Sequence, residues 1–122
     1  QRPDTVAAYY MERLRHRRTE CVVLASVDAR SRLLCDSMMS DGSATMSLIS
    51  PREIFLEALR CQAVSIILVH NHPSGDPSPS KADMELTGQL AGMGQMLGIP
   101  LLDHVIIGDN RYMSFREEKL IP

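Results

Sequence analysis

The chain has 122 residues, 44% of them hydrophobic and 23% charged, and its formal net charge is −2. A chain of this length folds around one core, so we expect a single domain over residues 1–122, and no apolar run approaches the roughly 20 residues of a membrane span, which argues against a transmembrane protein. The charge gives no general attraction to phosphate, so nucleic-acid binding would require a local basic patch.

The first segment predicts an amphipathic helix over residues 4–17, with Asp4 as its N-cap. The end of this helix is rich in arginine, at positions 13, 15, 17 and 18. This cluster is the best local candidate for a nucleic-acid patch. We interpret it instead as a solvated helix end, because basic side chains complement the negative end of the helix dipole.

The next segment predicts three strands. Apolar and β-branched residues over 21–27, and apolar residues over 33–39, flank a polar turn, which is typical of a hairpin. Asp41 and Gly42 indicate a second turn. Residues 44–49 then predict a third strand.

A helix is expected from Pro51 to residue 62. Ser50 is a suitable N-cap, Pro51 lacks an N–H where none is needed, and Glu53 stands where a capping box places an acid. The following residues, 63–69, are apolar at nearly every position and predict a central strand that is covered on both faces. His70 lies at the carboxyl end of this strand.

The last third of the chain predicts a helix and two strands. Ser80 and Asp83 have the spacing of a capping box, and the apolar residues after them have helical spacing up to Gly98. Residues 101–107 and 112–115 predict a hairpin around a polar turn. The order of elements predicts an α/β (α+β) fold, in which a mixed sheet is flanked by helices.

The cysteines, Cys21, Cys35 and Cys61, are widely separated and form no C-x-x-C pair. An odd number at such spacing argues against a disulfide framework and against a cysteine zinc site. We therefore expect unpaired thiols that fill core positions in a reducing compartment, and we predict a cytoplasmic location on that ground alone. Because the chain begins with Gln1 and not Met, we expect it to be part of a longer protein.

The segment from His70 to Asp83 carries the most specific pattern. His70 and His72 are two residues apart, so in an extended chain their rings point to the same side, with Cα atoms roughly 6.5 to 7 Å apart. Pro73 keeps His72 extended, and a proline-rich loop brings Asp83 back in the first turn of the next helix. Two imidazole nitrogens and one carboxylate oxygen leave a fourth position of a tetrahedral zinc open to water, which is typical of a catalytic site.

Each of these residues also has a simpler explanation on its own. A histidine at a strand end is usually a hydrogen-bonded residue of the core or surface, and Asp83 fits an ordinary capping-box acid. His104, beside Asp103 in an apolar run, is interpreted as a buried, hydrogen-bonded histidine and not as a fourth ligand. The combined spacing of the whole segment is what favours the metal site.

The same residues resemble the JAMM motif of MPN domains, which reads H-x-H-P, six residues, Ser, two residues and Asp. The matching positions are His70, His72, Pro73, Ser80 and Asp83. The string HNHPSGDPSPS, together with SPREIFLEAL before it and GIPLLDHVIIGD after it, is similar to the RadC branch, and the likeness spans nearly the whole chain. The resemblance implies an MPN (JAB-like) fold, with zinc bound by the two histidines and the aspartate.

The resemblance also implies a hydrolase of the metalloprotease type that attacks an amide or isopeptide bond of a peptide or protein. Glu20, directly before the strand at 21–27, corresponds to the glutamate that deprotonates the attacking water, although by itself it would be an ordinary surface acid. Ser80 corresponds to a serine that steadies the oxyanion, unless its hydroxyl serves as the N-cap. Asn71 replaces the Ser or Thr common in eukaryotic deubiquitinating members, so ubiquitin-type specificity is not carried over.

Two alternatives remain open. RadC proteins have been labelled DNA repair factors, but the loop has one lysine, Lys81, and no aromatic residue for base stacking. Nucleic-acid contact would lie in regions outside this chain, such as the helix-hairpin-helix-like segment that usually precedes the domain, with this domain as the C-terminal part. MPN domains without a complete motif serve as non-catalytic protein-interaction scaffolds. The oligomeric state does not follow from the sequence.

Overall fold

A computed structural model describes residues 2–42 and 46–121. Within these residues the chain forms helices and strands that are mixed along the sequence. In chain order they are α1 Pro3–Leu14, β1 Cys21–Val27, β2 Leu33–Asp41, the 3-10 helix η1 Met46–Leu48, α2 Pro51–Arg60, β3 Ser65–Asn71, α3 Lys81–Leu97, β4 Leu101–Ile107 and β5 Tyr112–Ser114.

The strands form one mixed five-stranded sheet in the order β2-β1-β3-β4-β5. β3 and β4 are parallel, and the other neighbours are antiparallel. α3 is the crossover that a parallel pair requires, because the chain has to return to the starting end of β3 before it enters β4. The predicted mixed sheet flanked by helices is therefore confirmed.

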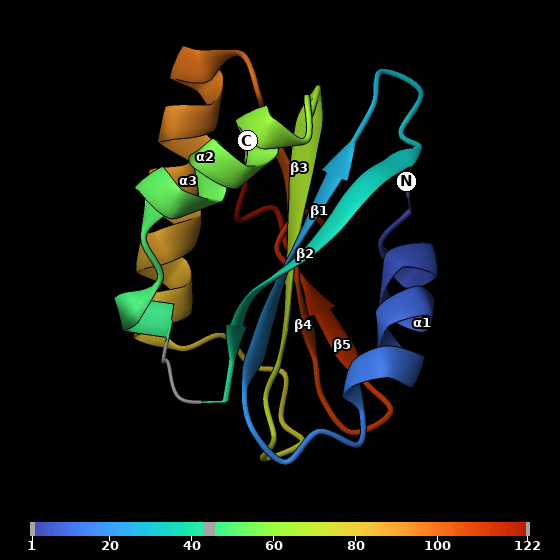
Figure 1. The fold of residues 1–122 in the computed structure, drawn as a ribbon. Helices are drawn as coiled ribbons and strands as arrows, with labels where there is room; N and C mark the ends of the chain where they lie inside the picture. The colour runs from blue at the N-terminus through green and yellow to red at the C-terminus, as the bar shows by residue number, and fades with distance from the viewer. Residues whose placement is uncertain (1, 43–45, 122) are drawn as a thin grey trace.

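Helices cover both faces of this sheet, with α1 on one side and α2 and α3 on the other (Figure 1). Side chains of β3 alternate between the two cores: Ile66 and Leu68 pack against α2 and α3, whereas Ile67 and Val69 pack against α1. Every residue of β3 is buried, as predicted for a central strand. No helix among the described residues combines the length and the apolar character needed to cross a bilayer.

The helix boundaries follow from local capping. Ser50 accepts the N–H of Glu53 at the start of α2, and Gly98, in the left-handed conformation, ends α3. The prediction for α1 is wrong at both ends, since the helix ends at Leu14 and not at residue 17. Its N-cap is Arg2 and not Asp4, because Pro3 occupies the first helical position, and no side chain closes the cap.

The strand predicted over 44–49 is also wrong where the structure describes it. Residues 46–48 form η1, and Met46 is buried in the core with α2 and α3. This segment packs under the helices and adds no strand to the sheet, whose edge is β2. Residues 44 and 45 lie outside the described residues.

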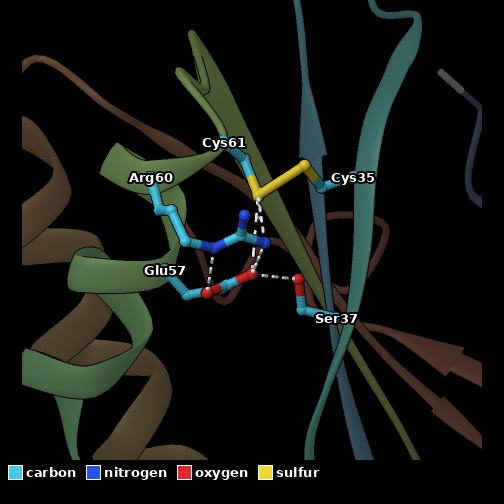
Figure 2. Close-up of a disulfide and its surroundings, with 5 residues drawn as sticks. All are labelled: Cys35, Ser37, Glu57, Arg60 and Cys61. Atoms are coloured by element: carbon cyan, nitrogen blue, oxygen red, sulfur yellow. Dashed lines mark hydrogen bonds and ion pairs between the residues drawn. A yellow bond between two sulfur atoms is a disulfide. The ribbon is translucent and has the colours of Figure 1, made fainter.

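Cys35 in β2 and Cys61, directly after α2, form a disulfide with their Cα atoms 6.0 Å apart (Figure 2). The prediction of unpaired thiols is therefore wrong for these two and correct for Cys21, which is buried and free. The pair depends on α2 packing beside β2, a contact that cysteine spacing does not encode. The cytoplasmic location rested on unpaired thiols, so it stays a prediction without that support.

A polar cluster beside the disulfide makes a second link between α2 and β2. Glu57 accepts a hydrogen bond from Ser37 at 2.6 Å and pairs with Arg60 at 2.6 Å (Figure 2). The Arg60 guanidinium, with help from Ser37, lowers the pKa of Glu57 to about 2. The edge strand is thus fastened to α2 by a covalent bond and by hydrogen bonds.

Candidate metal centre

Side chains from β3, α3 and the start of β1 meet at one end of the sheet. In Figure 1 the loop between β3 and α3, in yellow, lies at the same end as the start of β1, in blue. Val22 of β1 pairs with His70 of β3. Glu20 lies directly before β1 and His72 directly after β3, each two residues from this pair, and Asp83 lies in the first turn of α3.

The Asp83 carboxylate lies against both imidazoles. Its Oδ1 is 3.2 Å from Nε2 of His70, and its Oδ2 is 3.1 Å from Nε2 of His72. The side chains of Asp83 and His70 are fully buried, whereas His72 is 16% exposed. The three predicted ligands therefore converge, and solvent reaches them from the side of His72.

A hydrogen bond behind the His72 ring determines which nitrogen it presents to Asp83. Nδ1 of His72 is 2.9 Å from the carbonyl oxygen of Asp76. A carbonyl oxygen only accepts, so Nδ1 carries the proton, and the neutral ring presents a bare Nε2 to the carboxylate. Histidine ligands of metals are held in this way, with the distal N–H bound to a backbone carbonyl or a carboxylate.

His70 is held from behind by a second ring, because its Nδ1 is 2.9 Å from Nε2 of His104. On the other side, Nε2 of His70 and Oδ1 of Asp83 are both buried and neither makes a hydrogen bond. Each buried polar atom without a partner costs about 1–3 kcal/mol. Two such atoms that face one another at 3.2 Å fit a cation that both could bind.

The start of α3 aims the Asp83 side chain. Its Oδ2 accepts the N–H of Ser80 at 2.8 Å, and Ser80 Oγ accepts the N–H of Asp83 at 3.0 Å, so the predicted capping box is complete. Burial raises the pKa of Asp83, whereas hydrogen bonds from His70 and His72, made when these rings carry a proton on Nε2, and from the Ser80 N–H lower it well below its usual range. The carboxylate is therefore ionised, and it serves the helix cap and this cluster together.

Glu20 completes the cluster from the more open side. Its Oε1 is 3.5 Å from Nε2 of His70, and its side chain is 29% exposed. One ligand atom from each of Glu20, His70 and His72 lies within 4.8 Å of the others. The structure therefore brings the predicted base beside the predicted ligands.

Asn71 fixes the backbone on both sides of Glu20. Its Oδ1 accepts the N–H of Cys21 at 2.7 Å, and its Nδ2 donates to the carbonyl of Thr19 at 3.1 Å. Asn71 is buried on the face of β3 opposite the histidines. This role was missed from the sequence, where Asn71 was considered only for specificity, because it depends on the pairing of β1 with β3.

The charges of the cluster suit a divalent cation. Glu20 and Asp83 bring two carboxylates, while the two rings are neutral when their Nε2 atoms are bare. Contact with the Asp83 carboxylate raises the pKa of His72, against the effect of its burial, so a proton competes for the bare nitrogen as the pH falls. Nitrogen and oxygen donors of this kind bind zinc and other first-row divalent ions.

His104 also lies close enough to His70 and Asp83 to belong to a metal cluster. Its Nε2, however, is turned to Nδ1 of His70 and its Nδ1 to the Thr87 hydroxyl, so both ring nitrogens are already engaged. The ring is fully buried and stacks on Phe115. The interpretation of His104 as a buried, hydrogen-bonded residue is confirmed.

Comparison with known sequences bears on this geometry. The family of RadC-like JAB domains matches residues 1–120 of the chain. The chain belongs to the RadC-like JAB domain family. This membership confirms the resemblance drawn from the histidine-rich segment, and the observed mixed sheet between helices agrees with a JAB/MPN-like fold.

Curated relatives of this JAB domain carry the name UPF0758 protein. One from Clostridium perfringens is 43% identical over 120 residues, which are 98% of this chain and 53% of the relative. One from Desulfitobacterium hafniense is 46% identical over 119 residues, and one from Methanosarcina acetivorans is 42% identical over 119 residues, in both cases 98% of this chain and 52% of the relative. The JAB domain therefore spans about half the length of these relatives.

The loop between β3 and α3 of the JAB domain is braced against the β4–β5 turn. Gly75 has φ of +91°, a conformation that glycine adopts without strain, and its carbonyl accepts the N–H of Asp109 at 2.8 Å. A Cβ on Gly108 would lie 2.4 Å from the same carbonyl oxygen. The close approach of these two loops holds the backbone that carries His72.

Ser80 is exposed to solvent in this JAB domain and contacts Asp83 of the cluster. Its oxygen is engaged as the N-cap of α3, as one of the two sequence interpretations expected. That bond uses the oxygen as an acceptor, so the hydroxyl hydrogen is left for a second contact. The cap therefore does not conflict with a role as a donor.

Thr87 is the remaining residue of the cluster that the sequence analysis missed. It lies four residues after Asp83, so a helix places the two on the same face. That spacing was the only sequence signal, and threonines at such positions are common. Its contact with His104 required the packing of α3 on β4.

Proposed function

We propose that this JAB domain is a zinc-dependent hydrolase that cleaves an amide or isopeptide bond in a peptide or protein. The observation that carries the proposal is the pair of facing, unpartnered atoms, Nε2 of His70 and Oδ1 of Asp83, with Glu20 beside them. Buried polar atoms are nearly always hydrogen-bonded in proteins, so two that face one another without partners favour a missing ligand between them. Family membership supports metal-dependent hydrolysis, and the substrate class is part of the proposal.

His70, His72 and Asp83 would hold the metal through two imidazole nitrogens and a carboxylate oxygen. Zinc suits this donor set, and when bound it lowers the pKa of a water molecule towards neutrality and polarises a carbonyl as a Lewis acid. The hydrogen bonds from His72 to Asp76 and from Ser80 to Asp83 hold two of these ligands in place before any ion arrives. Such preorganisation is what a catalytic site requires.

Glu20 is the residue of the cluster placed to move protons. Its carboxylate is close to Nε2 of His70 and remains partly exposed, so it can take a proton from the attacking water and deliver it to the departing amine. Asn71 keeps the Glu20 backbone in place. The hydroxyl of Ser80 can donate to the oxygen of the attacked carbonyl as negative charge develops there.

The nucleic-acid alternative gains no support from the basic helix end. Arg13 pairs with Asp36, and Arg17 pairs with Asp41 at 2.7 Å. Two of the arginines in this cluster are thus paired with acids of the domain itself. Any DNA-repair role would then be a property of the longer relatives.

The ligand assignment is tested by the zinc content of the purified domain. We expect about one zinc per chain in the wild type and none after His72→Ala, because two ligands bind zinc far more weakly than three. Asp109→Asn is a matched control, since this exposed acid lies at the same end of the domain but outside the cluster. Equal zinc in the wild type and in His72→Ala would refute the ligand set.

The enzyme is tested with Glu20→Gln and a peptide library. We expect the variant to keep its zinc and lose at least about 100-fold of the hydrolysis rate, as removal of a general base does. Glu12→Gln is the control, since this side chain is 80% exposed on α1. Equal rates for Glu20→Gln and the wild type would remove Glu20 as the base, and zinc uptake without hydrolysis of any peptide would favour the scaffold alternative.

A further inference from the structure

Three buried side chains form a continuous chain of hydrogen bonds behind the candidate metal centre. Thr87 Oγ1 donates to the carbonyl oxygen of Asp83 at 2.7 Å. The same Oγ1 is 2.6 Å from Nδ1 of His104, and Nε2 of His104 is 2.9 Å from Nδ1 of His70. The chain begins at the backbone of one candidate ligand and ends at the ring of another.

The first hydrogen bond, from Thr87 to Asp83, determines the direction of the others. A carbonyl oxygen only accepts, so the single hydroxyl hydrogen of Thr87 is used on Asp83. Thr87 Oγ1 must then accept the N–H at Nδ1 of His104. A neutral His104 has no second N–H, so its Nε2 accepts from Nδ1 of His70, and Nε2 of His70 is left bare.

The surroundings of His104 keep this ring neutral. Its side chain is fully buried and its face stacks on Phe115, with ring centroids 4.6 Å apart. A positive charge on a fully buried ring is disfavoured, because no water is there to solvate it. The facing groups from other elements are Thr87 and Asp83 of α3 and His70 of β3, and the described hydrogen bonds place no carboxylate oxygen on the ring.

We propose that Thr87 and His104 form a buried relay that holds His70 in the tautomer with a bare Nε2, so that His104 is a positioning residue for metal binding. The effect of the relay on metal binding rests on the proposed function, because a bare Nε2 matters only if that nitrogen binds an ion. It also explains why a histidine is present at position 104. An apolar ring there could stack on Phe115 equally well but could not accept from His70.

The tautomers are tested directly by long-range proton–nitrogen NMR of the histidine rings, recorded with chelator and with one equivalent of zinc. We expect His104 to carry its proton on Nδ1 and to have a bare Nε2 in both samples. Nδ1 of His70 should be protonated in both. A proton found on Nε2 of His104 would reverse the relay and overturn the inference.

The contribution of the relay to metal binding is tested with paired substitutions. His104→Phe removes the acceptor, and we expect the dissociation constant for zinc to rise about 10- to 100-fold, as loss of such outer contacts does. His104→Gln, whose side-chain oxygen can accept from Nδ1 of His70, should recover most of the affinity. Equal weakening by both substitutions would mean that ring shape and not the acceptor matters, which contradicts the relay.

A second pair tests the other end of the relay and protects the result against a misfolded His104 variant. Thr87→Val keeps the shape and loses the hydroxyl, so we expect weaker zinc binding and a mixture of His104 tautomers. Thr87→Ser should behave as the wild type. If the wild type itself binds no zinc, the proposed function fails, and the His104 tautomer in the chelated sample still decides whether the relay exists.

Discussion

Replacing Asp83 by Asn should stabilise the metal-free domain while abolishing metal binding. An amide oxygen in place of Oδ2 still accepts the N–H of Ser80, so the helix cap is kept. The amide nitrogen then takes the place of Oδ1, which is 3.2 Å from the bare Nε2 of His70. This amide nitrogen can donate a hydrogen bond to Nε2 of His70, which has no hydrogen-bond partner in the wild type.

The size of the effect follows from these two atoms. The substitution removes Oδ1 and gives Nε2 of His70 a donor, so we count the cost of one unpartnered atom, about 1–3 kcal/mol, as relieved. Unfolding of a chain of 122 residues has an entropy of about 0.26 kcal/mol per kelvin, from ~2.1 cal/mol/K per residue. The metal-free variant should therefore melt about 4–12 °C above the metal-free wild type.

The pH of the measurement decides how clearly this is seen. Contact with Asp83 raises the pKa of His72, so a protonated His72 stabilises the wild type at pH values below its ordinary pKa, and this contribution is lost as the pH rises through the raised pKa. The variant lacks the carboxylate and so lacks this contribution. The stability difference should be largest near about pH 9, where the ring is neutral, and should shrink towards about pH 6.

Thermal unfolding with chelator and with excess zinc tests both halves of this prediction. Zinc at 1,000 times its dissociation constant should stabilise the wild type by about 4.1 kcal/mol, or about 16 °C, and should leave the variant unchanged, so the order of melting temperatures reverses. Asp109→Asn is the control for loss of one exposed acid. A chelated variant that melts below the wild type at alkaline pH would show that the facing atoms of His70 and Asp83 carry no strain, and would refute the reasoning.

Other features give predictions of defined size. The Cys35–Cys61 disulfide spans 26 residues, and its reduction should lower the free energy of unfolding by about 3.5 kcal/mol. Urea denaturation with and without reductant measures this difference. If the untreated folded chain contained three free thiols, the disulfide itself would be refuted. Zinc affinity by calorimetry should weaken as the pH falls through the raised pKa of His72, and a pH-independent constant would remove the proton competition. Gly94→Ala should destabilise the domain by about 1–3 kcal/mol, because the new Cβ would lie 2.5 Å from the carbonyl oxygen of Ile99. Gly92 has open space around it, so Gly92→Ala should stabilise the domain by about 0.5–1 kcal/mol in the same urea assay.

Local chemistry made much of this fold predictable. Capping at Ser50, Ser80 and Gly98 predicted the start of α2 and both ends of α3, and strand-length apolar runs identified β1, β3 and β4. Where the prediction was wrong, a neighbouring residue decided the outcome. Pro3 moved the start of α1 before Asp4, and burial of Met46 under the helices replaced an expected strand with η1.

Some residues of the candidate centre were likewise predictable from local sequence, and others depend on tertiary packing. The spacing of His70 and His72 is a property of one strand, and Asp83 is positioned by its own capping box, so these three could be predicted from short segments. Glu20 was found only through family resemblance, because its approach depends on antiparallel pairing over a separation of 50 residues between Cys21 and Asn71. The contacts of His104 and the pairing of Cys35 with Cys61 depend on tertiary packing and left no signal in the spacing.

The shared use of Asp83 by the cap of α3 and by the candidate centre has a consequence for folding order. The carboxylate reaches its place only when the first turn of the helix has formed, so the ion-binding geometry cannot precede the crossover between β3 and β4. Conversely, an ion bound to this carboxylate and to the two histidines would hold the amino end of α3 against the sheet. Amide hydrogens of that first turn should therefore exchange in step with release of the ion, which makes the helix end a reporter of occupancy.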